Sequence, residues 1–124
     1  MNYLFDTNAL IYLLKGKSKQ LPINDGDNIL ISFITKIELL SHNSTPEEEK
    51  NINKILENCD IFFIDDDLIN KTVDIRKTYG LKLPDSIIAA TALRENATLI
   101  TSDSQIIKKA PAMSIQIFNP LKTG

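Results

Sequence analysis

The sequence predicts an α/β protein with three layers, in which helices cover both faces of a central parallel sheet of about five strands. Short apolar segments alternate with segments of helical periodicity along the chain. The apolar segments are continuous, which is typical of strands that are buried on both faces. Helices that connect successive strands imply right-handed crossovers, and these make the strands parallel.

Strands are expected at residues 3–5, 29–31, 61–64, 97–100 and 114–118. Helices are expected at residues 7–14, 35–40, 46–58, 65–79, 86–96 and 104–109. The clearest start is Thr45-Pro46-Glu47-Glu48, because threonine caps a helix, proline suits its first turn and glutamate favours its positive end. Gly80 is the clearest C-terminal stop. The helix at 86–96 is apolar nearly all round, so we expect it to be buried.

The composition is that of one ordinary folded domain. The chain has 124 residues, 43% hydrophobic and 24% charged, with a formal net charge of −2. This charge argues against a protein that holds nucleic acid by bulk positive charge, but not against an enzyme with a local basic patch. The single cysteine, Cys59, excludes an internal disulfide and fits a cytoplasmic protein. The apolar runs are too short to span a bilayer, so no membrane partner is expected.

Four acidic residues are predicted to gather at one edge of the sheet. Asp6 follows the first strand and Asp103 follows the fourth. Glu38 lies on the helix after the second strand, and Asp85 lies at the start of the helix before the fourth. In an open parallel sheet, ligands bind beyond the carboxyl ends of the strands, where the strand order reverses. All four acids are placed to reach that edge.

Each acid, taken singly, is explained more simply as part of a helix cap. Asp6, Asp85 and Asp103 stand where helices begin, and aspartate is a favoured N-cap. Thr35 and Glu38 have the spacing of a capping box. Four carboxylates at one edge would nevertheless repel one another, and a fold would gain nothing by collecting them. A hard divalent cation such as Mg²⁺ or Mn²⁺ removes this repulsion because it prefers oxygen ligands.

Four segments, in this order and at these spacings, resemble the motifs of PIN-domain nucleases. They are Phe5-Asp6-Thr7-Asn8, Ile34-Thr35-Lys36-Ile37-Glu38-Leu39-Leu40, Leu83-Pro84-Asp85-Ser86-Ile87-Ile88-Ala89-Ala90-Thr91-Ala92 and Leu99-Ile100-Thr101-Ser102-Asp103. The resemblance runs through essentially the whole chain, and the nearest branch is the VapC-like toxins of prokaryotic toxin–antitoxin pairs.

The resemblance implies a single PIN-like nuclease domain over residues 1–124 that cleaves RNA with the help of Mg²⁺ or Mn²⁺. It implies catalytic and metal-binding roles for Asp6, Glu38, Asp85 and Asp103, and supporting roles for the hydroxyls of Thr7 and Thr101. It also implies a small antitoxin protein and a second copy of the chain as partners. Apolar residues in the helices between residues 46 and 79, in excess of what one small core needs, favour the homodimer as well.

The chain departs from the family pattern in two places. Ser86 stands where the family usually has alanine, and the segment after Asp103 lacks an expected phenylalanine.

Two other classes of protein remain open. A receiver-like signalling domain fits the length and the alternation, but it needs an acidic pair after the first strand, where the chain has only Asp6. It also needs a lysine after the fifth strand, where Asn119-Pro120 stands. The other class is a non-catalytic metal- or RNA-binding module, in which the acids only hold a structural ion. Measured cleavage separates it from an enzyme.

Basic residues in the loops are the candidates for contacts with RNA. The main candidates are Lys15, Lys17 and Lys19, and the weaker ones are Lys36, Arg76 and Lys82. His42 is the only histidine, and we expect it to be a surface residue without a catalytic role.

Overall fold

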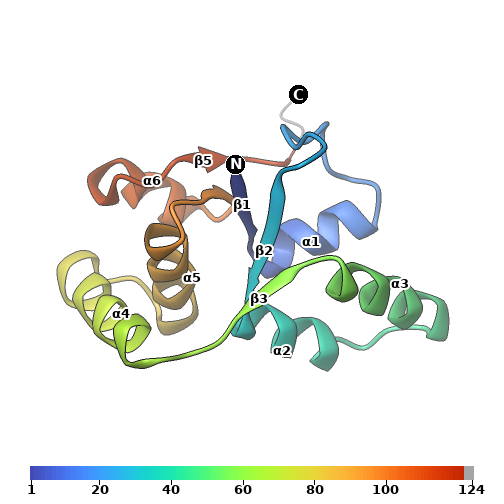
Figure 1. Ribbon diagram of the computed structural model, residues 1–124, viewed down its shortest axis with the longest axis horizontal. Helices are drawn as coiled ribbons and strands as arrows, with labels where there is room; N and C mark the ends of the chain where they lie inside the picture. The colour runs from blue at the N-terminus through green and yellow to red at the C-terminus, as the bar shows by residue number, and fades with distance from the viewer. Residues whose placement is uncertain (122–124) are drawn as a thin grey trace.

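Five strands form one sheet, and six helices cover its two faces in the computed structural model, which describes residues 1–121 (Figure 1). The strands are β1 (Asn2–Phe5), β2 (Asn28–Ser32), β3 (Asp60–Phe62), β4 (Thr98–Ile100) and β5 (Ile117–Phe118). The helices are α1 (Thr7–Leu14), α2 (Phe33–Ser41), α3 (Pro46–Glu57), α4 (Asp66–Tyr79), α5 (Leu83–Arg94) and α6 (Ser104–Met113). The predicted three-layer α/β/α fold is therefore confirmed.

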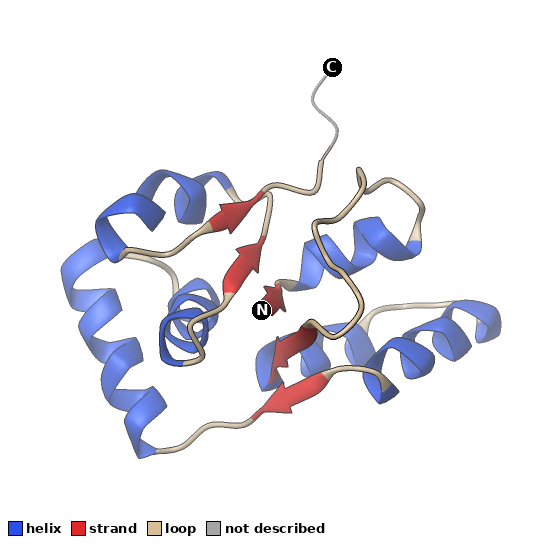
Figure 2. Cartoon of the chain, turned by 45° about the horizontal axis from the view of Figure 1, so that its top comes forward, coloured by secondary structure: helices blue, strands red, loops and turns tan. Residues whose placement is uncertain are grey.

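The strand order is β3-β2-β1-β4-β5, and every neighbouring pair is parallel. Figure 2 shows the strands between groups of helices on either side. The chain builds outward from β1 in one direction with β2 and β3, and then in the other direction with β4 and β5. The order thus reverses between β1 and β4, which is the point where sheets of this kind bind their ligands.

Alternate residues of the central strands enter two separate hydrophobic cores. Leu4 and Leu99 face the core beneath α4, α5 and α6, whereas Phe5 and Ile100 face the core beneath α1, α2 and α3. The two-residue period of a strand produces this division. Burial on both faces explains why these strands read as continuous apolar runs.

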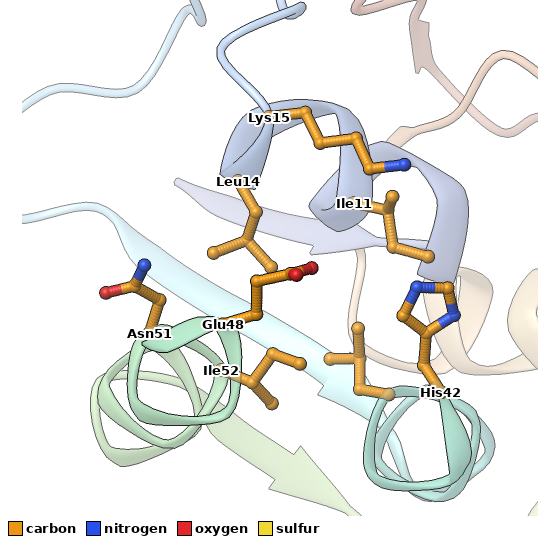
Figure 3. A pocket seen from close by; sticks show the side chains of 8 residues that line it. Ile11, Leu14, Lys15, His42, Glu48, Asn51 and Ile52 are labelled. Carbon is orange, nitrogen blue, oxygen red and sulfur yellow. The ribbon is translucent and has the colours of Figure 1, made fainter. Parts of the chain in front are cut away.

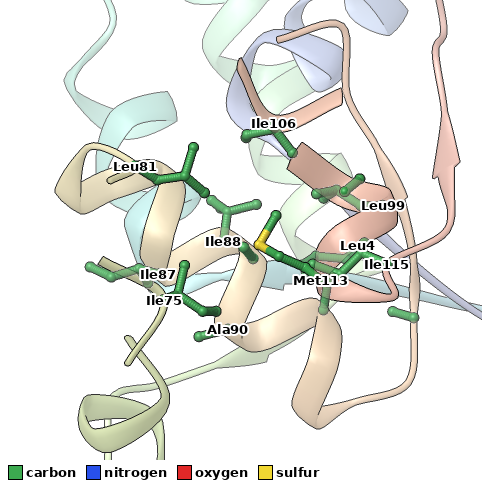
Figure 4. Packing of buried hydrophobic residues seen from close by; sticks show 14 of the residues in the cluster. Leu4, Ile75, Leu81, Ile87, Ile88, Ala90, Leu99, Ile106, Met113 and Ile115 are labelled. Carbon is green, nitrogen blue, oxygen red and sulfur yellow. The ribbon is translucent and has the colours of Figure 1, made fainter. Parts of the chain in front are cut away.

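Helix α5 is buried in the core that contains Leu4 and Leu99, as its apolar sequence predicts. All its residues from Ser86 to Ala92 are buried. Figure 4 shows Ile87, Ile88 and Ala90 of this helix packed with Leu99 and Met113. The helix is therefore held from several sides, which fixes the position of its first turn and of Asp85.

Three helices differ from their predicted bounds by more than one residue. α5 begins at Leu83, three residues before the predicted start at Ser86, and it ends at Arg94, two residues before the predicted end at Asn96. α2 begins two residues before Thr35, since Ser32 accepts a hydrogen bond from the Ile34 amide and is the N-cap. α6 continues beyond Lys109 to Met113 although it contains Pro111. Buried contacts of the last turn with the core outweigh the amide hydrogen bond that proline cannot donate. The fifth strand is shorter than expected, and it begins only at Ile117.

The edge strand β3 ends before Phe63 and Ile64, which were predicted to continue it. Both side chains are exposed, at 62% and 52% of their surface. β3 pairs with β2 on one side only, so the sheet gives these residues no second surface to bury against. An apolar surface is left at the start of the connection to α4.

Local helix signals in the sequence are confirmed at α3 and α4. Thr45 and Glu48 form a reciprocal capping box. Asp65 caps α4, and Gly80 ends it in the left-handed conformation. No helix in residues 1–121 is both long and apolar enough to cross a membrane. The predicted single domain over residues 1–124 includes residues 122–124, which lie outside the described residues.

Candidate active site

Asp6 and Thr101 meet where the order of the sheet reverses. Asp6 follows β1 and Thr101 follows β4, and the last residues of the two strands, Phe5 and Ile100, are paired. The Asp6 amide donates to the Ile100 carbonyl at 3.2 Å, which extends the pairing by one step. The sheet itself therefore places both side chains at its carboxyl edge.

The Asp6 carboxylate is nearly buried, with 9% of the residue exposed, and both of its oxygens are engaged. Oδ1 accepts from the Ala9 amide at 2.8 Å and so caps α1, and Oδ2 accepts a short hydrogen bond from the Thr101 hydroxyl. Burial raises the pKa of Asp6 above its ordinary value, although the two donors oppose that effect. The charges of Asp103 and Asp85 raise this pKa further.

Thr101 connects Asp6 to Asp103. The Thr101 side chain is fully buried, and while its hydroxyl donates to Asp6 it accepts from the Asp103 amide at 3.1 Å. Asp103 Oδ1 accepts from the amides of Gln105 and Ile106, both at 2.9 Å, so Asp103 caps α6. Only Oδ1 takes part in this cap, which leaves Asp103 Oδ2 outside it.

Asp85 is not a helix cap, although its position in the sequence allowed that interpretation. α5 begins at Leu83, its N-cap residue is Lys82, and no side chain caps it. Asp85 is half-buried in the first turn. Burial raises its pKa most, Asp103 and Glu38 raise it further, and the positive charge of Lys82 lowers it. Asp85 is therefore close enough to two other acids for their charges to act on it.

Glu38 is held by a hydroxyl and not by the predicted capping box. Because Ser32 caps α2, the pair of Thr35 and Glu38 does not form the box. The Thr7 hydroxyl instead donates to Glu38 Oε1 at 2.7 Å, and it lies 3.4 Å from the hydroxyl of the buried Thr35. Glu38 is exposed, so this hydrogen bond orients a side chain that packing leaves free.

The structure thus brings together all six residues that the sequence singled out. They are Asp6, Thr7, Glu38, Asp85, Thr101 and Asp103. Within the described part of the chain, no group of three or more acidic, histidine or cysteine side chains is already arranged to hold a metal ion. The donors themselves suit a hard cation, since all are oxygens and the negative charge is in excess. A divalent cation would relieve the electrostatic cost that raises the pKa values of Asp6 and Asp85.

Two roles near the site were missed by the sequence analysis. The Ser86 hydroxyl donates to the carbonyls of Leu81 and Lys82, at 3.2 and 2.9 Å, which accounts for serine in place of alanine. A serine four residues after Lys82 in a helix could have indicated this bond. The buried hydroxyl of Thr35, beside Thr7, could not be found from spacing, because it depends on how α1 and α2 pack.

Two of the three main basic candidates for RNA contacts have neighbours other than the four acids. Lys19 is held over the Phe118 ring, 4.8 Å from its centroid. Lys15 borders a cavity of about 150 Å³ between α1, α2 and α3, beside Ile11 and Ile52 (Figure 3). His42, also at this cavity, is exposed as expected. None of the four acids lines the cavity. Among residues 1–121, Lys82 is the one cation whose charge shifts the pKa of Asp6 or Asp85, and it lowers that of Asp85.

A family model described as "PIN domain" matches residues 3–111 of the chain. Among solved structures, the toxin–antitoxin complex from Klebsiella pneumoniae is similar at 30% identity and a TM-score of 0.77, covering 98% of this chain and 99% of that one. VapBC-1 from nontypeable Haemophilus influenzae is 24% identical, with a TM-score of 0.71 and coverage of 96% and 98%. DNA-bound VapBC from Salmonella typhimurium is 19% identical, with a TM-score of 0.77 and coverage of 95% and 97%. The last two likenesses support the fold alone. No curated protein matches the chain.

Replacing Asp85 by asparagine should make the metal-free protein more stable at neutral pH. The folded state raises the pKa of Asp85, so the folded protein holds its proton more tightly than the unfolded chain does. The stability of the wild type therefore falls as the pH rises through the interval between the ordinary and the raised pKa. The measurement is the melting temperature of Asp85→Asn minus that of the wild type, in EDTA. This difference should be absent at low pH, grow through that interval and then level off. Asp74→Asn, an exposed aspartate-to-asparagine change on α4, is the matched control. A variant less stable than the wild type at pH 7 would contradict the argument.

Proposed function

Because this chain belongs to the PIN domain family, whose members are nucleases, we propose that it is a metal-dependent endoribonuclease that hydrolyses RNA phosphodiester bonds. The observation that carries the proposal is the convergence of Asp6, Glu38, Asp85 and Asp103 at the reversal point of the sheet. Membership of the PIN domain family accounts for the fold, so the receiver-like signalling domain is no longer an alternative. A non-catalytic metal- or RNA-binding module remains as the alternative. RNA is the proposed substrate because the resemblance to the VapC-like toxin branch implies it.

The four acids would hold Mg²⁺ or Mn²⁺, with Asp6 and Asp85 as the central ligands. Such a cation, when bound, neutralises the phosphate and lowers the pKa of a coordinated water. The chain's own residues prepare the site for it. Thr101 and the Ala9 amide fix both oxygens of Asp6, and the Thr7 hydroxyl fixes Glu38. These hydrogen bonds orient the carboxylates before any ligand arrives, as the hydrogen-bond partners of metal ligands commonly do.

Purified protein should cleave a labelled single-stranded RNA with Mg²⁺ or Mn²⁺ and stop when EDTA is added. Asp6→Asn and Asp85→Asn should each lower the rate about 100-fold or more, because they remove a charge that neutral asparagine cannot replace. Thr101→Val keeps the shape of the buried residue but loses the bond to Asp6, and should lower the rate about 10- to 100-fold. Asp74→Asn is the matched surface control. Full activity of either aspartate variant, with the fold intact by circular dichroism, would refute the assignment.

We also propose that the protein is a homodimer. Exposed apolar side chains gather on the connection after β3, on α4 and at the start of α5, and are Phe63, Ile64, Ile69, Val73 and Leu83. Most of them border a hollow of about 180 Å³ beside Arg76. The sequence predicts surplus apolar residues in the helices between residues 46 and 79. α3 carries none of the large exposed ones, so the surplus lies in the second half of that range. A second copy of the chain would cover this surface.

Light scattering at micromolar concentration should give the mass of a dimer for the wild type and of a monomer for Val73→Glu. A glutamate at this position would place a charge in the proposed apolar interface, where it has no partner. Leu40→Glu, a similarly exposed position on α2, is the control and should stay dimeric. A monomeric wild type over the micromolar range would rule the dimer out.

The third part of the proposal is a small antitoxin partner that silences the enzyme. Support comes from the similarity to a chain of the toxin–antitoxin complex from Klebsiella pneumoniae. An acidic site can bind an arginine side chain, whose guanidinium donates paired hydrogen bonds to carboxylates. Such a side chain would compete with the metal for the same oxygens.

Expression of the protein alone should slow growth, and Asp6→Asn should relieve the effect. Co-expression of the neighbouring small reading frame should restore growth in the wild type. In the purified complex, titration should show weaker Mn²⁺ binding than in the free protein, because arginine and metal cannot share the oxygens. Unchanged Mn²⁺ affinity would place the inhibitor elsewhere, and the cavity between α1, α2 and α3 would be the next surface to test.

A further inference from the structure

Lys82 is an exposed cation without a partner, one helical turn before Asp85. Its ammonium group takes part in no ion pair or hydrogen bond among residues 1–121. Among the other cations of residues 1–121, Arg94 binds Asp65, Lys71 binds Asp67 and Lys109 donates to the Tyr79 carbonyl. Most of the remaining lysines have no such partner either, so Lys82 is distinguished by its position beside Asp85. Lys82 is thus a free positive charge at the rim of the acidic site, where its charge acts on Asp85.

The backbone of Lys82 is held firmly although its side chain is free. Its carbonyl accepts from both the amide and the hydroxyl of Ser86, each at 2.9 Å. The same hydroxyl donates to the carbonyl of the buried Leu81. Pro84 restricts the backbone within the same turn. The backbone of Lys82 is therefore fixed relative to Asp85, while its exposed side chain is not held by any hydrogen bond within residues 1–121.

Stability does not explain a lysine at this position. A cation at the N-terminus of a helix faces the positive end of the helix dipole and caps no amide. The other helices of the described chain begin with side-chain caps, which are Asp6, Ser32, Thr45, Asp65 and Asp103. At α5 the residue at the cap makes no hydrogen bond from its side chain. Helix capping therefore does not account for a lysine at this position.

We propose that Lys82 binds a phosphate of the RNA strand beside the one that is cleaved, and so contributes directly to substrate affinity. The inference rests on the proposed ribonuclease function. The acids repel a polyanion, and the chain as a whole is negative. A cation at the rim of the cluster offsets that repulsion where the strand must enter. Lysine, a point charge on a flexible stem, suits an electrostatic contact with a phosphate.

A role limited to tuning Asp85 makes a different prediction. If Lys82 served only to keep that carboxyl charged, its removal would change kcat and the pH profile, and it would leave KM and the salt dependence as they were. A phosphate contact has the opposite signature, since binding that neutralises one phosphate fewer depends less steeply on the salt concentration.

The first experiment compares Lys82→Gln, Lys82→Arg and Lys50→Gln with the wild type in RNA cleavage. Lys50 is an exposed lysine on α3, which Figure 1 shows across the molecule from α5, so it controls for the removal of one positive charge. Lys82→Gln should raise KM about three- to fivefold with kcat nearly unchanged, and should lower the salt slope by about one. Lys82→Arg should restore both values. A Lys82→Gln variant that matches Lys50→Gln in KM and salt slope overturns the inference.

The second experiment measures binding without catalysis, so that it does not depend on the nuclease proposal. Asp6→Asn protein is titrated into a fluorescein-labelled single-stranded RNA in EDTA, with and without Lys82→Gln, and anisotropy is recorded. Weaker binding by the double variant, about three- to fivefold, supports the phosphate contact even if the wild type cleaves nothing. Two outcomes overturn the phosphate contact even if the wild type is an active nuclease. One is equal RNA affinity of the single and double variants, and the other is no RNA binding by Asp6→Asn protein that keeps Lys82.

Discussion

The hydrogen bond from the Thr101 hydroxyl to the Asp6 carboxylate joins the two central strands at the point where the sheet reverses its order, and the arrangement of the site depends on it. Thr101 also accepts from the Asp103 amide, so one buried hydroxyl sets the relative position of two acids. A buried carboxylate without donors would take up a proton or move toward solvent. With donors on both oxygens, Asp6 remains aimed at the carboxyl edge of the sheet, although burial and its acidic neighbours raise its pKa.

Structural and functional interpretations of these acids are compatible. Asp6 and Asp103 are true N-caps, as their positions in the sequence suggest, and each uses Oδ1 for capping. The cap leaves the second oxygen of the same carboxylate for another partner, and it fixes the direction in which that oxygen points. Helix starts at the carboxyl ends of β1 and β4 therefore supply oriented carboxylates as a consequence of the fold. Asp85 and Glu38 have no capping role, so their presence at this edge is not explained by local helix formation.

Features encoded in neighbouring residues could be predicted from the sequence, and features produced by packing could not. The helix start at Thr45 and the helix stop at Gly80 depend on a few adjacent residues, and both were predicted, although the reciprocal capping by Thr45 and Glu48 was not. The start of α2 was missed because Ser32 competes with Thr35 as a cap, and packing of the helix against both cores decides between them. The length of α6 was missed because Pro111 is a stop signal locally. The positions of the four acids could be anticipated because they depend on the edge of a parallel sheet, whereas the contact between Thr7 and Glu38 depends on how α1 meets α2.

The sequence around α5 combines strong packing with an unfavourable first turn. Its middle is buried on all sides, and Ser86 adds hydrogen bonds inside the helix, so the position of its N-terminus is fixed by contacts that do not involve the cap. A helix held in this way can tolerate a lysine at the cap, where its charge faces the positive end of the helix dipole. It can also tolerate the partial burial of an aspartate three residues later. Conflicts between local preference and the whole fold persist where the surrounding structure outweighs them, and they tend to mark functional positions. Lys82 and Asp85 lie at the carboxyl edge beside Asp103 and Glu38, so the core beneath α4, α5 and α6 supports this part of the site.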